Sequence, residues 1–159
     1  MADESLNMII DGTTANWDMR VEGDIAGTYA GTFKFRCYLT PMQKIAANRE
    51  MRELLGSHAT MAPEHEANLA FALTQLKHRI VSAPPFWNSV TSGMAGDLPD
   101  ANVILAVLDA AYVAELKYVA QIKEKKASAI SRAKTAAEAI LNSQGKDDPE
   151  DGAQDESQN

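Results

Sequence analysis

The sequence predicts an α+β fold, in which a small antiparallel β-sheet or hairpin near the N-terminus packs on a helical bundle of about three helices. Residues 17–40 are rich in aromatic and β-branched residues and end in an alternation of apolar and polar positions, typical of a half-buried strand. Residues 41–144 instead repeat their apolar positions at helical spacing, with breaks at Gly56 and at Pro84-Pro85. Strands followed by helices indicate the α+β class.

The expected sheet is built from the N-terminal third of the chain. Residues 1–16 are mixed and polar, and only Met8-Ile9-Ile10 can pair as a short strand. Glycines in the following segment favour the turns of a hairpin: Gly23, Gly27 and Gly31. The last strand should turn one set of side chains into the core: Phe33, Phe35, Cys37 and Leu39. Cys37 is therefore expected to act as a small buried hydrophobe and not as a nucleophile.

Two helices of moderate length should follow the sheet. Thr40-Pro41 pairs an N-cap residue with one tolerated at the first helical position, and Gly56 is a natural C-terminal stop. The first helix has these apolar positions: Met42, Ile45, Ala46, Met51, Leu54 and Leu55. A second helix should run from about residue 63 to residue 82, because Pro84 closes it. Its apolar face recurs at spacings of three and four: Leu69, Leu73, Leu76 and Ile80.

The last helical region should run over residues 100–144, with Asp97 or Asp100 as its N-cap. Its first part carries large apolar residues, such as Val103, that suit a core. From Ile122 onward the sequence is alanine-rich and charged and keeps one thin apolar stripe, here called the C-terminal stripe: Ile130, Ala133, Ala137, Ile140 and Leu141. This composition has high helix propensity but too few large apolar residues for a core. We expect a projecting helix that is either continuous or else frayed or kinked near Lys125.

These elements predict a single α+β domain at residues 1–124, a helical extension at 125–144 and a disordered acidic tail at 145–159. Residues 88–98 are expected to form a flexible loop. Residues 146–159 contain six acids and one lysine, a composition that does not support a packed core. The tail is interpreted either as a solubilising appendage or as a docking segment.

The composition argues against several classes of function. The net charge is −7, and the sequence lacks the block of Lys and Arg that sequence-independent nucleic-acid binding needs. The single cysteine rules out an intramolecular disulfide, which fits a reducing compartment. The N-terminus has no signal-peptide pattern, and no apolar run approaches the roughly 20 residues that span a bilayer. The sequence therefore predicts a soluble intracellular protein without nucleic-acid or membrane partners.

No arrangement of residues predicts catalysis. The glycines precede no GK[ST] motif of a phosphate-binding loop. The three histidines begin no recognised metal-ligand pattern, and one cysteine cannot form a thiolate cluster. No nucleophile lies at a recognisable spacing from a base. We therefore expect no catalytic, cofactor-binding or metal-binding residues, and we expect that the protein is not an enzyme.

The remaining features point to protein–protein interaction. Phe86 and Trp87 follow a rigid Pro-Pro elbow, where they are either a core plug between helices and sheet or anchors for a partner. The C-terminal stripe either packs on a partner helix or belongs to a charged, solvated helix. Both features are candidates for contact with a partner.

Three blocks of the sequence stand in a recognisable order. A strand leads into a TP-initiated helix ending in RELLG at 31–56, a leucine-striped helix runs into APPFW at 69–89, and a helix rich in Ala and Val occupies 102–123. Together the blocks resemble the tail assembly chaperones and related small tail-region proteins of long-tailed bacteriophages. The resemblance is one of layout and local phrasing, and it covers residues 31–123.

The resemblance implies a non-enzymatic chaperone of virion morphogenesis in the host bacterial cytoplasm. Such chaperones bind the tape measure protein and tail-tube subunits during tail assembly and are typically absent from finished virions. Self-association into a homo-oligomer is compatible with this role. The residues expected to contact a partner are Phe86, Trp87, Ile130, Ile140 and Leu141.

The β-rich N-terminal third departs from small all-helical chaperones of this kind. A structural virion protein, such as a neck, decoration or tail component, is therefore the alternative. In that alternative, the N-terminal strands would extend the sheet of a neighbouring subunit.

Overall fold

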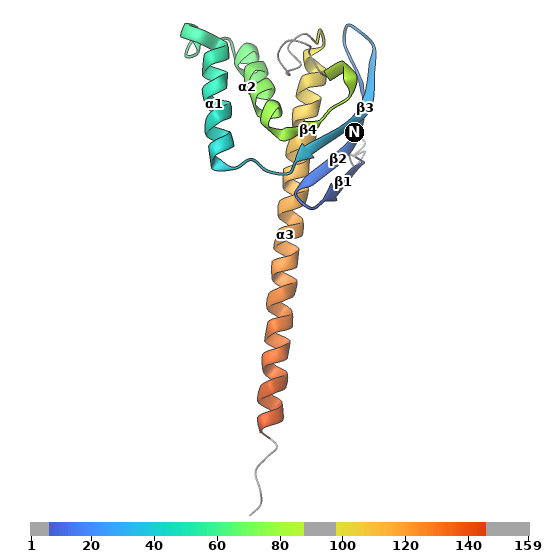
Figure 1. Cartoon of the computed structure of the whole chain (residues 1–159), viewed down its shortest axis with the longest axis vertical. Coiled ribbons are helices and arrows are strands. Elements are labelled where there is room, and N and C mark those ends of the chain that lie inside the picture. The colour runs from blue at the N-terminus through green and yellow to red at the C-terminus, as the bar shows by residue number, and fades with distance from the viewer. Residues whose placement is uncertain (1–6, 88–97, 146–159) are drawn as a thin grey trace, which may run out of the picture. The chain divides into compact units, whose positions relative to one another are not determined.

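A four-stranded antiparallel sheet forms the N-terminal part of the fold (Figure 1). The computed structural model describes residues 7–87 and 98–145, so the predicted loop and the predicted acidic tail lie outside it, except for their end residues 98 and 145. Neighbouring strands pair in the order β1-β2-β3-β4. The strands are β1 (Met8–Asp11), β2 (Thr14–Glu22), β3 (Thr28–Arg36) and β4 (Ile80–Ser82).

The helices are α1 (Pro41–Leu55), α2 (Glu64–Arg79) and α3 (Ala101–Gln144), with short 3-10 helices at η1 (Gly56–His58) and η2 (Pro85–Trp87). The predicted α+β class is confirmed. The chain divides into two compact units, here called the N-terminal unit (Met1–Ala120) and the C-terminal unit (Gln121–Asn159). The division falls inside α3, as does the predicted domain boundary after residue 124. Of the two alternatives for residues 100–144, the structure shows the continuous one, because α3 is a single helix from Ala101 to Gln144.

The β1–β2 hairpin confirms the short strand expected at Met8-Ile9-Ile10. Met8 lies opposite Trp17 and Ile10 lies opposite Ala15. The turn between the strands contains Gly12 with φ of 59°, a left-handed conformation that glycine adopts without steric cost. The sheet therefore begins at Met8, before residues 17–40, whose composition predicts strands.

The β2–β3 hairpin supplies the contribution of the sheet to the core. Trp17 lies opposite Phe33 and Ala15 lies opposite Phe35, and all four side chains are buried. The rings of Phe33 and Phe35 stack with centroids 5.7 Å apart. The inward alternation continues past the end of β3, which confirms the predicted set of core side chains: Phe33, Phe35, Cys37 and Leu39.

The start of α1 follows the predicted chemistry. Thr40 is the N-cap, and the backbone N–H of Gln43 donates to the Thr40 hydroxyl at 3.3 Å. The backbone N–H of Thr40 donates to the side-chain oxygen of Gln43 at 2.9 Å, which completes a capping box. Pro41 occupies the first turn, and Gly56 with φ of 65° is the C-cap. Both predicted ends of this helix are confirmed.

The apolar positions of α1 do not become core. Ala47 is the one buried residue that the helix contributes, whereas Met42 is 73% exposed and Ile45 is 60% exposed. The small Ala47 side chain lets α1 lie close against α2, and the helices stand side by side in Figure 1. Only one narrow face of α1 is covered, so the larger side chains on the opposite face reach solvent.

The predicted end of the second helix is wrong, because the last three residues assigned to it form a short strand. α2 ends at Arg79, and the following three residues pair with β3 as β4, with Ile80 opposite Phe35. Pro84 holds the preceding residue in extended geometry, and Ile80 and Val81 are β-branched, so this end of the segment favours a strand. Within α2, the expected stripe is partly confirmed, because Leu76 is buried and the other stripe residues are half-buried: Leu69, Leu73 and Ile80.

The first part of α3 completes the core of the N-terminal unit. One cluster of buried residues joins β2, β3, α2, η2 and the start of α3, which confirms the large apolar residues expected there. The contributions of α3 are Val103, Ile104, Val107, Leu108, Ala110 and Ala111. The thirteen buried residues of this cluster all precede Tyr112, so the hydrophobic burial that stabilises the fold is concentrated in the N-terminal unit.

Gly31 lies against the Pro-Pro elbow. A Cβ at position 31 would stand 2.5 Å from Cγ of the buried Pro84, closer than real carbon contacts allow. We predict that Gly31→Ala destabilises the fold by about 1–3 kcal/mol because the elbow must move off the strand. Urea denaturation followed by tryptophan fluorescence measures this. Ala30→Ser, on the exposed side of the same strand, is the control, and equal midpoints for the two variants would contradict the close packing.

Candidate functional site

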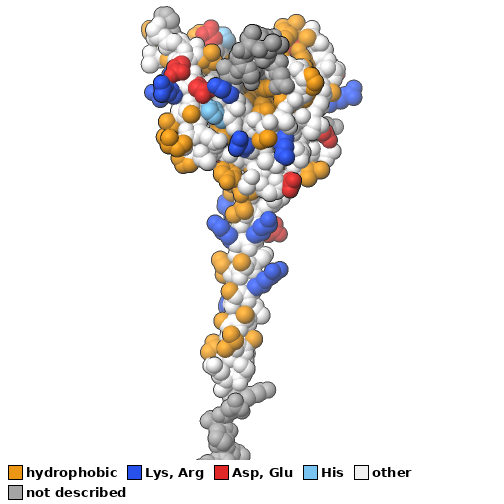
Figure 2. All heavy atoms as spheres, in the orientation of Figure 1, with side chains coloured by type: hydrophobic (Ala, Val, Ile, Leu, Met, Phe, Trp, Pro, Cys, Tyr) orange, Lys and Arg blue, Asp and Glu red, His pale blue; other side chains and the backbone are white. Residues whose placement is uncertain are grey.

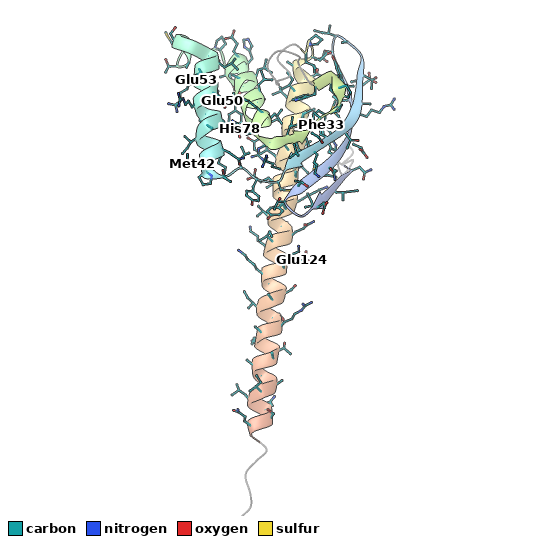
Figure 3. All side chains as sticks on the ribbon, viewed as in Figure 1. Phe33, Met42, Glu50, Glu53, His78 and Glu124 are labelled. Carbon is teal, nitrogen blue, oxygen red and sulfur yellow. The ribbon has the colours of Figure 1, made fainter. Side chains whose placement is uncertain are left out.

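Phe86 and Trp87 lie in the turn η2 directly after the elbow. The backbone N–H of Trp87 donates to the carbonyl of Pro84 at 3.0 Å and closes this turn. The Trp87 ring meets Phe33 edge-on with centroids 5.1 Å apart. Phe86 packs edge-on against Tyr29 at 5.1 Å and against Phe33 at 6.2 Å. Figure 3 labels Phe33 in the sheet that these rings cover.

This placement favours the core-plug interpretation of the elbow. Trp87 is 3% exposed and belongs to the main core cluster, and the half-buried Phe86 packs against that cluster. A partner could reach Trp87 only after the core had opened, so the interpretation of Trp87 as an anchor does not fit its burial. The core-plug interpretation fits, and the candidate surface for partners moves to the C-terminal helix.

The C-terminal part of α3 is exposed throughout. Every residue from Lys123 to Gly145 is exposed. Three large residues of the C-terminal stripe present most of their surface to solvent: Ile130 at 70%, Ile140 at 58% and Leu141 at 69%. Figure 2 shows hydrophobic side chains along this helix, interrupted by Lys and Arg. Apolar side chains on a well-formed helix with no cover are the features of an unoccupied helix-binding face.

The same part of α3 is basic. Residues 121–144 hold five cations and two anions, a net charge of +3, although the whole chain carries −7. The cations are Lys123, Lys125, Lys126, Arg132 and Lys134. Among the described residues, the ion pairs join other side chains, and none of these five cations takes part in one. The cations are therefore available to acidic groups of a partner.

A cluster of polar side chains joins α1 to α2. Glu50 of α1 accepts from Lys77 at 2.9 Å and lies 3.1 Å from the ring nitrogen Nε2 of His78, both on α2. Figure 3 shows Glu50 and His78 together between the two helices, and Met42 at the N-terminal end of α1. The hydrogen bond from Lys77 is the main cause that lowers the pKa of the Glu50 carboxyl. We interpret this cluster as a clamp between two helices.

Asp100 fixes the start of α3 to the β2–β3 turn. Its buried carboxylate accepts from the backbone N–H of Ile25 at 2.6 Å, from that of Ala26 at 3.0 Å and from the Tyr29 hydroxyl at 2.7 Å. Burial by itself raises the pKa of this carboxyl, but these donors and the backbone N–H of Asp24 outweigh burial and lower the pKa. The predicted N-cap residue thus uses its carboxylate for a long-range contact.

Stability should fall in acid because of Asp100. Its folded pKa lies below the ordinary value of 3.8, so the unfolded chain binds the proton first as the pH falls. The contribution is present above that value and is lost as the pH passes through the folded pKa. We expect Asp100→Asn to be less stable than the parent at neutral pH, and this gap should shrink below about pH 4. Thermal melts from pH 7 to pH 2 measure it, and a gap independent of pH would contradict the prediction.

A buried cation lies at the end of α2. The side chain of Arg79 is 3% exposed, and its Nη2 donates to Glu115 of α3 at 2.7 Å. The guanidinium carbon also lies 5.0 Å from the centre of the Tyr112 ring, a cation–π distance. Two further nitrogens of Arg79, Nε and Nη1, have no hydrogen-bond partner among the residues that the structure describes. Glu115 is therefore the principal charge that compensates this cation.

Sequence reasoning missed the contacts of Asp100 and Arg79. In the sequence Arg79 looked like one of several basic residues at the polar end of a helix, and its partner Glu115 is 36 residues away. The available signal was position, because Arg79 lies three residues after Leu76, on the apolar side of α2. Without the tertiary fold, no pattern joins these two positions.

Metal sites and membrane spans are two other features that the described part of the chain could contain. Within it, no group of three or more His, Cys, Asp or Glu side chains could hold a metal ion. None of its helices combines the length and the apolar character that crossing a membrane requires. Comparison with protein-family models, with curated proteins and with solved structures finds no match to the chain.

Proposed function

We propose that the chain is a non-enzymatic protein-binding protein. It uses the exposed C-terminal part of α3, residues 121–144 and here called the C-terminal helix, to hold a helical segment of a client. More specifically, we propose a tail assembly chaperone of a long-tailed bacteriophage. It acts in the host bacterial cytoplasm, and its clients are the tape measure protein and tail-tube subunits. The observation that carries the binding role is the continuous α3, whose stripe residues Ile130, Ile140 and Leu141 are exposed. The phage role rests on the resemblance over residues 31–123.

The physical support is that the two parts of α3 differ in burial. Its first part is committed to a core that is closed without any partner. Its second part keeps a helical conformation although nothing in the described chain covers it. A preformed helix loses less conformational entropy on binding than a disordered segment, so its exposed apolar residues can contribute more of their burial to affinity.

The test is co-expression of the full chain with the tape measure protein of the phage that encodes it. We expect the tape measure protein to stay soluble and to co-purify, because its exposed apolar helices would be covered. The double variant Ile130→Asp with Leu141→Asp should abolish co-purification. Mass spectrometry of purified virions should find the tape measure protein and not this chain.

The matched control places the same charges on the other side of the helix. At 100° per residue, Ser131 and Asn142 lie on the polar face of the same two turns. The variant Ser131→Asp with Asn142→Asp should therefore retain co-purification. Equal loss in both double variants would remove the stripe from the proposal, and precipitation of the tape measure protein despite the parent chain would contradict the chaperone role.

One observation favours the structural virion protein as a second candidate. β1 lies at one end of the strand order, and its Ile9 is exposed. An edge strand of this kind can pair with a strand of a neighbouring subunit. Presence of the chain in purified virions, in a fixed ratio to the tail-tube protein, would support this candidate over the chaperone.

A further inference from the structure

We infer that the helical client segment is acidic and amphipathic, with carboxylates that flank its apolar face. This inference rests on the proposed protein-binding role of the C-terminal helix and adds the chemistry of the partner. It comes from the distribution of charge along the chain and around that helix. The partner is defined by this chemistry alone.

The C-terminal part of α3 differs in charge from the segments on either side of it. Residues 1–120 contain nine Lys and Arg and fourteen Asp and Glu, a net charge of −5. Residues 121–144 carry +3, and residues 146–159 carry −5. The segment with the exposed stripe is therefore basic, although the chain as a whole is acidic. A basic helix face favours an acidic partner through attraction and through faster association.

Three of the five cations lie on or beside the line of the stripe, whereas Lys125 and Arg132 lie about 60° and 80° from its Ile140 edge. At 100° per residue, the stripe spans about 100° of the helix circumference, and Lys134 lies about 20° beyond its Leu141 edge. Lys123 and Lys126 continue the direction of the stripe toward the N-terminus. The acids Glu124 and Glu138 lie more than about 50° from either edge. A client helix seated on the stripe would thus meet lysines first.

The make-up of the stripe favours a helix over a membrane surface. Two of its five residues are alanines, and no aromatic residue is present. Binding at a lipid interface scales with the apolar area that is buried, which is small for this stripe. Alanines instead allow two helix axes to approach closely, because the distance between packed helices depends on the side chains at the contact. An anionic lipid surface is therefore the weaker occupant.

Two occupants from this chain are also disfavoured. A second copy would bring another helix of charge +3 against the first, and like charges oppose that contact. The acidic segment 146–159 has the right charge, but it contains no Leu, Ile, Val, Met or aromatic residue to cover the stripe. A separate chain with both carboxylates and apolar side chains fits the face better than either.

The experiment measures binding of the full chain to three fluorescent helical peptides by anisotropy. The first peptide carries Leu and Ala on one face and Glu beside that face, the second replaces each Glu by Lys, and the third has the composition of the first with its apolar residues scattered. We expect the first to bind at least about tenfold more tightly than either of the others. Its binding should weaken as salt is raised.

Charge variants test whether binding depends on the cations of this helix or only on the net charge of the chain. Lys126→Glu with Lys134→Glu should weaken binding of the first peptide by about tenfold or more. Arg20→Glu with Lys44→Glu changes the net charge equally at exposed positions of the N-terminal unit and should leave binding unchanged. Equal effects of the two variants would overturn the inference.

Further measurements test the competing occupants of the C-terminal stripe. Vesicles of phosphatidylcholine with phosphatidylserine, a single-stranded oligonucleotide and sedimentation of the chain alone test lipid, nucleic acid and a second copy. Stronger binding of vesicles or oligonucleotide than of the first peptide, a dimer broken by Ile130→Asp, or no binding of that peptide would each overturn the inference. If the tape measure protein co-purifies while the acidic peptide fails, the partner chemistry is wrong and the proposed function stands. The reverse result rejects the tape measure protein as the client and keeps both the binding role of the helix and the partner chemistry.

Discussion

Trp87→Ala should destabilise the fold by about 3–5 kcal/mol, the range for deleting a large aromatic side chain from a core. Trp87 is 3% exposed and meets Phe33 of β3 edge-on, and its cluster joins the sheet to α2 and α3. Removing the ring leaves a cavity at that junction, which the surrounding elements can only partly fill. Urea denaturation followed by circular dichroism at 222 nm measures the loss.

The control for this variant is Met42→Ala, which truncates an exposed apolar side chain of α1. It should change stability by no more than about 0.5 kcal/mol. Equal small effects of the two substitutions would show that Trp87 is not part of a closed core. That result would favour the interpretation of Trp87 as an anchor for a partner.

Glu115→Ala should cost about 3–5 kcal/mol, because it leaves the buried Arg79 cation without its counter-charge. Within the described part of the chain, two nitrogens of Arg79 already lack hydrogen-bond partners, so the remaining ring contact with Tyr112 cannot replace the carboxylate. The loss should appear as a lower midpoint in urea with an unchanged slope. An intact midpoint would contradict the assignment of Glu115 as the compensating charge.

Two controls identify the source of that loss. Glu53→Ala removes the exposed Arg49–Glu53 pair of α1 and should cost only about 0.3–0.5 kcal/mol, as surface pairs at this spacing do. Arg79→Met with Glu115→Met removes both charges and should recover most of the stability, since apolar replacements of a buried pair are often neutral or stabilising. A double variant as unstable as Glu115→Ala would place the defect in packing and not in charge.

Local patterns predicted the elements that local physics controls. The alternation through Phe33 and Phe35 predicted which side chains enter the core, because a strand turns successive residues to opposite faces. Thr40 and Gly56 marked both ends of α1, because capping is decided by neighbouring backbone groups. These predictions required no knowledge of which elements lie beside one another.

The features that depend on distant partners were not predicted. β4 exists because Ile80 finds an open edge of β3, and residues near Ile80 read equally well as the last turn of a helix. Asp97 and Asp100 are the two predicted N-cap residues of α3; Asp97 lies outside the described residues, and the donors of the β2–β3 turn hold the carboxylate of Asp100. Met42 was counted as an apolar position of a packed helix, yet α1 contacts its neighbour through another face.

The candidate site was predicted in part. The stripe was found from its spacing, but the sequence left open whether Ile130 and Leu141 face solvent or another part of the chain. Their exposure required the structure. The basic character of the same helix was hidden by the acidic total of the whole chain, because the flanking segments outweigh it.

Amide hydrogen exchange of the full chain, with and without the tape measure protein, tests the central claim most directly. Without the client, amides of residues 121–144 should exchange faster than those of β3, because every residue from Lys123 onward in this segment is exposed. With the client, protection should rise over residues 121–144 and stay unchanged around Trp87. Protection that rises at the elbow, or at no segment of α3, would contradict the claim that this helix holds the client.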